Sequence, residues 1–213
     1  MLIDTVGKIN IFCGKRNSGK SILMKYMIEQ SMEKYKKVYL ISPSEKINKF
    51  YSDIIKNEQI YDEYNEGWIN SLIEKMTKIN EGKTSKHSDF INVLLILDDC
   101  GSDTNFHSSR SLNILVSRGR HMGITLYIAI QHLNCCAPIC RENSDYIFVG
   151  KLSRNSLELL LDNYHTGEID KKDFIKMYNK ATLNYSFLVI YNNATVDNCL
   201  NNIYSSIKVP FIE

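Results

Sequence analysis

Residues 14–21 combine two glycines, a lysine and a hydroxyl side chain at a spacing that can bind phosphate. They read Gly14-Lys15-Arg16-Asn17-Ser18-Gly19-Lys20-Ser21, the pattern G-x-x-x-x-G-K-[ST]. The glycines permit a tight loop whose backbone N–H groups point inward at an anion. Lys20 can reach the β- and γ-phosphates of a nucleoside triphosphate, and the Ser21 hydroxyl can bind Mg²⁺. The candidate phosphate-binding residues are therefore Gly14, Asn17, Ser18, Gly19, Lys20 and Ser21.

The sequence on both sides of this loop supports the same interpretation. Residues 9–13 form a short apolar run that is typical of a buried strand. Ile22, Leu23, Tyr26 and Met27 then repeat at helical spacing. The motif requires this order of strand, glycine loop and helix, because the positive end of the helix dipole then faces the anion. An ordinary turn rich in Gly, Ser and Lys is the alternative.

Two carboxylates follow a second apolar run, as in a Walker B motif. Val93 to Leu97 are apolar, and Asp98 and Asp99 come directly after them. Such a run fits a strand buried on both faces of a parallel sheet, and open α/β sheets bind ligands at the carboxyl ends of these strands. We therefore expect Asp98 to lie near Ser21 and hold Mg²⁺, and Asp99 to orient and deprotonate the attacking water. An acidic turn after a core strand is the alternative.

A glutamine closes a further apolar run. Residues 124–130 predict a buried strand, and Gln131 stands at its tip. A glutamine in that place can sense the γ-phosphate or position a water molecule, as a glutamine does in P-loop enzymes. Alternatively, Gln131 is simply the polar residue that ends the strand.

The composition is that of a globular protein. The 213 residues suit one domain with a sizeable core, with 44% hydrophobic and 23% charged residues. A net charge of +2 neither demands nor excludes a nucleic-acid partner. We expect no membrane span, because no apolar run approaches the roughly 20 residues that one requires. We see no start that resembles a signal peptide.

The cysteines are interpreted as reduced thiols. Two of the six cysteines, Cys13 and Cys100, lie within or beside the nucleotide motifs, where a disulfide would interfere. Cys135, Cys136 and Cys140 could form part of a metal site. However, no matching Cys/His pair at finger-like spacing completes that cluster.

Strands and helices alternate along the chain and predict a three-layer α/β fold with a mostly parallel central sheet. The expected strands are 9–13, 37–43, 93–97, 124–130, 145–150 and 185–191. The expected helices follow the glycine loop and lie around 47–55, 68–76, 112–116, 156–164 and 171–178. We predict a single domain over 1–213, with additional C-terminal elements from about 162 to 213. The tail from Asn192 is not assigned.

One segment resembles a known superfamily. Residues 120–131 read RHMGITLYIAIQ and are similar to the R-x-x-G-I-x-L-x-x-A-x-Q segment of the FtsK/HerA superfamily of DNA-pumping ATPases. The order of elements in residues 139–161 is also similar. The compact size, Asp98-Asp99-Cys100 and Arg118-Gly119-Arg120-His121 look most like the genome-packaging ATPases of poxviruses, other large DNA viruses and virophages. The resemblance covers roughly residues 8–161 and the strand at 185–191.

The resemblance implies a RecA-like (ASCE) P-loop NTPase that hydrolyses ATP with Mg²⁺ and drives double-stranded DNA into a capsid. Lys20 matches the P-loop lysine, Asp98 the Mg²⁺ carboxylate and Gln131 the sensor glutamine, while Asp99 stands at the position of the catalytic base. Arg120 matches an arginine presented across a subunit boundary to the neighbour's γ-phosphate. A planar guanidinium suits that role, although the dipole of a preceding helix would also favour a cation there. Arg118 is the second candidate. Many superfamily members have glutamate where this chain has Asp99, which is one methylene shorter.

The resemblance also implies partners and a location. These are a homo-oligomeric ring (a pentamer or hexamer), double-stranded DNA held through its phosphates, and a capsid or portal-vertex protein. The implied location is the host cytoplasm or viral factory, or association with the virion. The 99–107 loop, Lys83 and Lys86 are candidate DNA contacts.

Three other functions remain open. A small-molecule kinase would need an arginine-rich lid, and Arg141 and Arg154 are the only arginines after Arg120. A GTP-dependent switch would need the guanine-reading motif N-K-x-D, but the segment from Asn179 to Thr182 lacks the aspartate. A nucleotide-binding structural subunit without hydrolysis is the third alternative, which intact Lys20, Asp98 and Gln131 disfavour.

Overall fold

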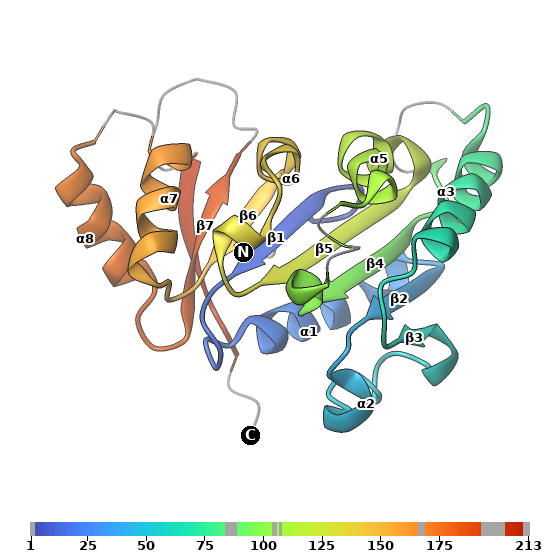
Figure 1. The fold of residues 1–213 in the computed structure, drawn as a ribbon, viewed down its shortest axis with the longest axis horizontal. Helices are drawn as coiled ribbons and strands as arrows, with labels where there is room; N and C mark the ends of the chain where they lie inside the picture. Colours follow the sequence, from blue (N-terminus) through green and yellow to red (C-terminus); the bar gives the residue numbers. More distant parts are fainter. Residues whose placement is uncertain are drawn as a thin grey trace.

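A computed structural model of the chain describes residues 3–83, 89–103, 106, 108–165, 169–192 and 203–210. Within them, eight strands form one sheet in the order β3-β2-β4-β5-β1-β6-β7-β8 (Figure 1). The strands are β1 (Ile9–Cys13), β2 (Lys37–Ile41), β3 (Ile60–Tyr61), β4 (Val93–Asp98), β5 (Ile124–Ile130), β6 (Tyr146–Val149), β7 (Ser186–Tyr191) and β8 (Tyr204–Lys208). Strands β1 to β6 run parallel, and β7 and β8 pair antiparallel with their neighbours. The predicted mostly parallel sheet is confirmed.

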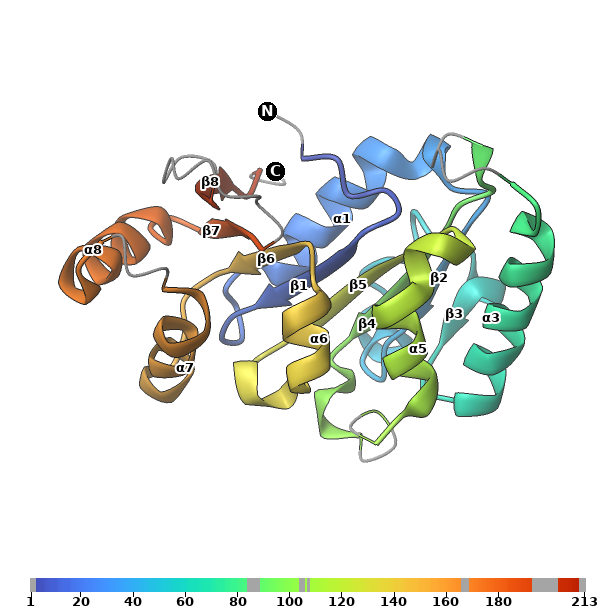
Figure 2. The same ribbon diagram turned by 90° about the horizontal axis from the view of Figure 1, so that it is seen from above.

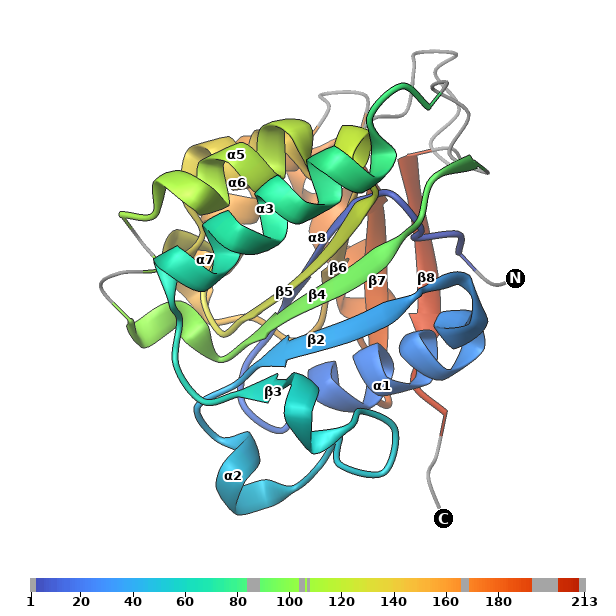
Figure 3. The same cartoon turned by 90° about the vertical axis from the view of Figure 1, so that its right-hand side faces the viewer.

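Helices cover both faces of the sheet and give the molecule three layers. The α-helices are α1 (Lys20–Ser31), α2 (Glu45–Asn48), α3 (Glu66–Asn80), α5 (Arg110–Arg118), α6 (Pro138–Asn143), α7 (Arg154–Tyr164) and α8 (Lys171–Ala181). Figure 3 shows α1 and α2 on one side of the sheet and α3, α5, α6, α7 and α8 on the other. Seen from above, β7, β8 and α8 lie at one end of the sheet and α3 at the other (Figure 2).

The alternation of side chains in β4 explains where its last residue points. Leu95 and Leu97 pack into the core that includes α3 and α5, whereas Leu94 and Ile96 pack into the core beneath α1. Successive side chains of a strand point to opposite faces, so Asp98 belongs to the set of Leu94 and Ile96. The carboxylate therefore emerges on the face that carries α1 and Ser21.

Strand β5 lies between the strand that precedes the glycine loop and the strand that ends in Asp98. It pairs with β1 and with β4, and Ala129 is in register with both Phe12 and Asp98. The carboxyl ends of β1, β4 and β5 therefore lie side by side, at the same height in the sheet. Gly14, Asp99 and Gln131, which follow these strands, meet at one edge of the sheet.

One local expectation is wrong, and two strands form where none is predicted. The helix expected around 47–55 is only the short α2, which ends where Lys49 adopts a left-handed φ of 48°. The chain then turns inward, because Tyr51 and Ile55 are buried in the core beneath α1. Strand β3 has two residues, too few to show a period. Strand β8 lies in the unassigned tail, where its buried and partly exposed residues form a weak apolar pattern.

Candidate active site

The glycine loop has the backbone geometry of an anion-binding loop. Gly19, the residue before α1, has a φ of 89°, and Asn17 has a φ of 58°. A Cβ atom at Gly14 would lie 2.7 Å from the Ser18 Oγ atom, so a side chain at this position would displace that hydroxyl group. The Lys20 Nζ atom donates to the carbonyl oxygens of Gly14 at 2.7 Å and Lys15 at 3.1 Å, which holds the ammonium group inside the loop.

The Lys20 ammonium group is buried beside two carboxylates. Lys20 is 8% exposed. Burial lowers the pKa of Lys20, because a charged group loses hydration in the interior, while Asp99 and Asp98 act in the opposite direction. Negative charge therefore lies close to the Lys20 ammonium group. Lys20 is also the first residue of α1, where the positive end of the helix dipole adds to the attraction for an anion such as phosphate.

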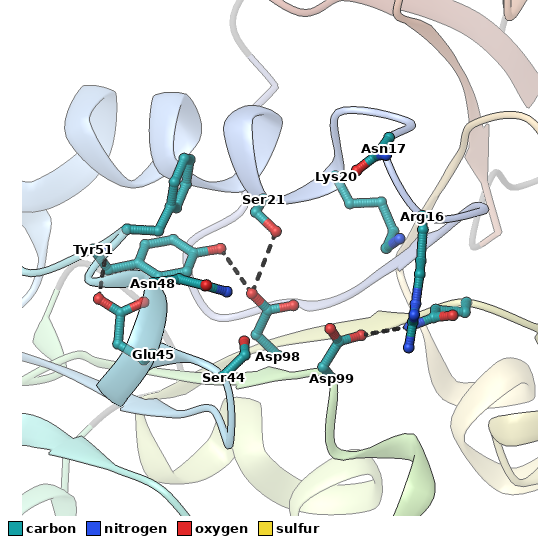
Figure 4. A pocket seen from close by; sticks show the side chains of 12 residues that line it. Arg16, Asn17, Lys20, Ser21, Ser44, Glu45, Asn48, Tyr51, Asp98 and Asp99 are labelled. Atoms are coloured by element: carbon teal, nitrogen blue, oxygen red, sulfur yellow. Dashed lines mark hydrogen bonds between the residues drawn. The ribbon is translucent and has the colours of Figure 1, made fainter.

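Asp98 is held by two hydroxyl groups. Its Oδ2 atom accepts a hydrogen bond from the Tyr51 hydroxyl at 3.1 Å and from Ser21 Oγ at 3.4 Å (Figure 4). Asp98 is 6% exposed, and burial together with the charge of Asp99 raises its pKa to about 6. A buried carboxylate beside a serine hydroxyl is a set of hard oxygen donors, which suits Mg²⁺.

Asp99 and Gln131 contact each other at the same edge of the sheet. The Gln131 Nε2 atom donates to Asp99 Oδ1 at 3.2 Å. Asp99 has a left-handed φ of 57°, an uncommon backbone conformation for an aspartate, and its side chain lines the same cavity as that of Asp98. A carboxylate and an amide in contact could together hold one water molecule, with Asp99 accepting its proton.

These residues line one cavity of about 480 Å³. Its lining consists of Arg16, Asn17, Lys20, Ser21, Ser44, Glu45, Asn48, Phe50, Tyr51, Asp98, Asp99 and Gln131. A second cavity of about 530 Å³ shares Arg16, Ser44, Asp99 and Gln131 with the first and extends toward Ile47 and His132. Of the predicted site residues, the cavity brings together Asn17, Lys20, Ser21, Asp98, Asp99 and Gln131. Gly14, Ser18 and Gly19 belong to the loop but do not line the cavity.

Comparison with known proteins assigns the chain to a family. The sequence profile of the family described as Poxvirus A32 protein matches residues 7–206. The chain belongs to this family. An uncharacterized protein of Invertebrate iridescent virus 6 is 32% identical over 194 residues, which are 90% of this chain and 73% of that protein. The resemblance to proteins of poxviruses and other large DNA viruses is therefore confirmed.

Solved structures share the fold of this A32-family chain. The genome packaging NTPase of Sulfolobus turreted icosahedral virus 2 in complex with AMPPCP matches with a TM-score of 0.64 at 18% identity, covering 97% of this chain and 99% of that one. EssC (ATPases 2 and 3) from Geobacillus thermodenitrificans matches with a TM-score of 0.60 at 13% identity, covering 92% and 42%. The predicted three-layer P-loop fold is confirmed.

Arg120 and Arg118 do not line the cavity in this A32-family chain. Arg118 ends α5, and Arg120 lies in a short 3₁₀ turn (Gly119–Met122) that precedes β5, with both side chains exposed. Arg120 Nε donates to the His121 ring at 3.4 Å. Because Gln131 follows the other end of β5, the arginines and the cavity lie at opposite edges of the sheet.

The expected DNA contacts do not lie together. Lys83 follows α3 at the edge where Arg120 lies, and its Nζ atom donates to Asn80 Oδ1 at 3.0 Å. The 99–107 loop begins at the cavity edge. Lys86 and the loop residues 104, 105 and 107 lie outside the described residues. Among the described residues, no helix is long and apolar enough to cross a membrane.

The cysteines of the described segments are unbridged. Cys13, Cys100, Cys135, Cys136 and Cys140 are free thiols, and burial raises the pKa of Cys13 to about 12. Cys199 lies outside the described residues. The buried Cys13 thiol therefore stays protonated at neutral pH and behaves as a small apolar side chain.

Sequence reasoning missed Tyr51 and Glu45 as residues of the site. Glu45 is 4% exposed, and its Oε1 atom accepts a hydrogen bond from the Tyr51 backbone N–H at 2.7 Å. Both residues come from the segment after β2, which pairs with the Asp98 strand. A usable signal was present, since Pro43 marks the carboxyl end of a strand, where such sheets bind ligands.

Proposed function

We propose that this chain is an ATP-hydrolysing motor that moves double-stranded DNA, and that the DNA is a viral genome being packaged into a capsid. The observation that carries the proposal is the convergence of Lys20, Asp98, Asp99 and Gln131 on one cavity. Gln131 enters on a strand that lies between the P-loop strand and the Asp98 strand. Membership of the A32 family and the fold shared with a genome packaging NTPase support it.

Each residue of the cavity has a chemical role in this proposal. The N–H groups of residues 14–21 and the Lys20 ammonium bind the phosphates. Ser21 and Asp98 would hold Mg²⁺, which would supply positive charge to the phosphates. Asp99 accepts the proton of the attacking water, and Gln131 fixes that water in line with the γ-phosphate. Arg120 of a neighbouring copy supplies a guanidinium to the terminal phosphate.

The proposed assembly is a ring of identical chains that grips DNA through its phosphates and docks on a capsid or portal-vertex protein. The continuous sheet from β3 to β8 supports one domain over 1–213. The proposed place of action is the host cytoplasm or viral factory, where a capsid is filled.

The test is ATP hydrolysis measured with and without long double-stranded DNA over a range of protein concentrations. We expect the rate per chain to rise with DNA and with concentration, because the complete site needs a second copy. Lys20→Ala should lower the rate by roughly two orders of magnitude, since the phosphates lose their buried cation. Lys171→Ala, which removes an exposed lysine from the start of α8, is the matched control.

A rate that is flat in concentration and indifferent to DNA would remove the motor interpretation. Small-molecule phosphoryl acceptors would then be tested in place of DNA. Nucleotide binding without any hydrolysis would instead favour the structural subunit.

A further inference from the structure

A hollow lies across the P-loop from the cavity described above. It has a volume of about 270 Å³ and is lined by Asn17, Ser18, Lys151, Thr182, Asn184, Tyr185 and Ser186. Asn17 lines both this hollow and the large cavity. Of the residues assigned to phosphate, Mg²⁺ or water, only Asn17 and Ser18 of the loop line this hollow.

The order of the strands decides which part of a nucleotide this hollow faces. Strand β1, which leads into the loop, has β5 on one side and β6 on the other. Asp98, Asp99 and Gln131 all follow β4 or β5, so the terminal phosphate lies toward β5. The nucleoside is at the opposite end of the triphosphate and must leave the loop toward β6, where Lys151 follows the strand.

The hollow has a fixed frame. The P-loop is tied to it because the Lys15 N–H donates to the Lys151 carbonyl oxygen at 2.8 Å. The turn between α8 and β7 forms the other wall. Its Tyr185 carbonyl oxygen accepts from the Val209 N–H at 3.1 Å, and its Ser186 N–H donates to the Leu183 carbonyl oxygen at 3.0 Å. Elements from the C-terminal part of the chain therefore build this wall.

Tyr185 presents an aromatic ring at the mouth of the hollow under backbone strain. Its φ is 57° and that of Asn184 is 52°, so two successive non-glycine residues adopt the left-handed conformation. The side chain is 57% exposed, yet it lies against the loop, since a Cβ atom at Gly19 would be 3.6 Å from Tyr185 Cδ1. An exposed ring held in a strained turn beside a phosphate loop is not explained by packing.

We propose that this hollow is the nucleoside subsite and that the Tyr185 ring stacks on the base of the bound nucleotide. Asn184 and Asn17 supply amide groups at the rim for the base edge and ribose. Stacking on an aromatic face favours the larger purines over pyrimidines. The inference rests on the proposed nucleotide-binding function and assigns a role to the C-terminal elements.

The test compares Tyr185→Asn with Tyr185→Phe. Asparagine tolerates the left-handed conformation, so Tyr185→Asn removes the ring without adding strain, whereas phenylalanine keeps the ring. The dissociation constants of ATP and of inorganic tripolyphosphate are measured by calorimetry with Mg²⁺ present. We expect Tyr185→Asn to weaken ATP binding roughly tenfold or more, to leave tripolyphosphate unchanged, and Tyr185→Phe to match the unaltered chain for both ligands. Leu183→Asn, at an exposed neighbouring position that does not line the hollow, is the control.

Other outcomes overturn the inference in distinct ways. Equal weakening of ATP and tripolyphosphate would mean that Tyr185 only supports the loop at Gly19. Unchanged ATP binding in Tyr185→Asn would place the base elsewhere. If the unaltered chain binds neither ATP nor tripolyphosphate, the proposed function fails, and the subsite fails with it.

Discussion

The buried carboxylate of Asp98 lowers the stability of the folded protein at neutral pH. Its pKa is raised from 3.8 to about 6, so the folded protein binds this proton more tightly than the unfolded chain does. Ionising the carboxylate therefore costs folding free energy at pH values above about 4, and the cost is complete above about 6. The Tyr51 and Ser21 hydroxyls and the Lys20 ammonium group offset part of the cost.

We expect Asp98→Asn to stabilise the protein at neutral pH while removing a proposed metal ligand. The pKa shift of about 2 units corresponds to a gain of up to about 3 kcal/mol at pH 7.5, and this gain should shrink as the pH falls from 6 toward 4. Urea unfolding at pH 7.5 and 4.5, with a chelator present, measures it. Asp53→Asn should show no such gain, because Lys25 lowers the pKa of Asp53. Equal gains at both pH values would contradict the electrostatic explanation.

At the scale of elements, one buried side chain aligns the strands that carry the site. Asn80, at the end of α3, donates from Nδ2 to the carbonyl oxygens of Met122 at 2.9 Å and Ile91 at 3.0 Å, and its Oδ1 atom accepts from the Ile91 N–H at 2.9 Å. Ile91 and Met122 stand just before β4 and β5. Asn80 thus fixes where both strands start, and this helps to set the positions of Asp98 and Gln131 at the carboxyl ends of these strands.

We expect Asn80→Ala to lower the free energy of unfolding by about 2–4 kcal/mol, because it leaves buried backbone groups without partners. Urea unfolding measures this loss. Asn113→Ala, an exposed position on α5, should change stability by less than about 0.5 kcal/mol. A loss no larger than that of Asn113→Ala would show that the bonds of Asn80 do not hold the strand starts.

The whole molecule presents two unlike edges, with the cavity at one and Arg120 at the other. The seven residues of β5 separate Arg120 from Gln131 by about 23 Å at the rise of a strand. The proposed arginine therefore cannot serve the cavity of its own chain. In the proposed ring, a head-to-tail contact between copies would join the two edges, and repeated rotation would close such contacts.

Mixing two inactive variants tests this geometry. Arg120→Ala and Lys20→Ala should each lose ATP hydrolysis alone, whereas an equimolar mixture should regain up to roughly a quarter of the activity, because random mixing joins an intact loop to an intact arginine at about one interface in four. The rate of ATP hydrolysis after mixing is the measurement. Arg118→Ala in place of Arg120→Ala distinguishes the two candidate arginines. No recovery from mixtures that still assemble would exclude a site shared between copies.

The sequence by itself determined the features that depend on short-range order. The glycine loop, the strand before it and the helix after it are contiguous, so Gly14 to Ser21 could be read directly. The apolar run before Asp98 and Asp99 indicated a strand buried on both faces, and the carboxyl-end rule then brought both carboxylates to the loop. Residues 120–131 added the superfamily resemblance and directed attention to Gln131 and Arg120.

Only the tertiary structure decided which distant segments meet. The placement of β5 between β1 and β4, the entry of Tyr51 and Glu45 into the cavity, and the wall formed by Tyr185 all depend on pairing between residues far apart in the chain. Periodicity reports which face of an element is buried, but it carries no information about which element covers that face. The sequence of the segment after Pro43 is typical of a polar helix. It becomes part of the cavity because the Tyr51 hydroxyl donates a hydrogen bond to the buried carboxylate of Asp98, at the end of a distant strand.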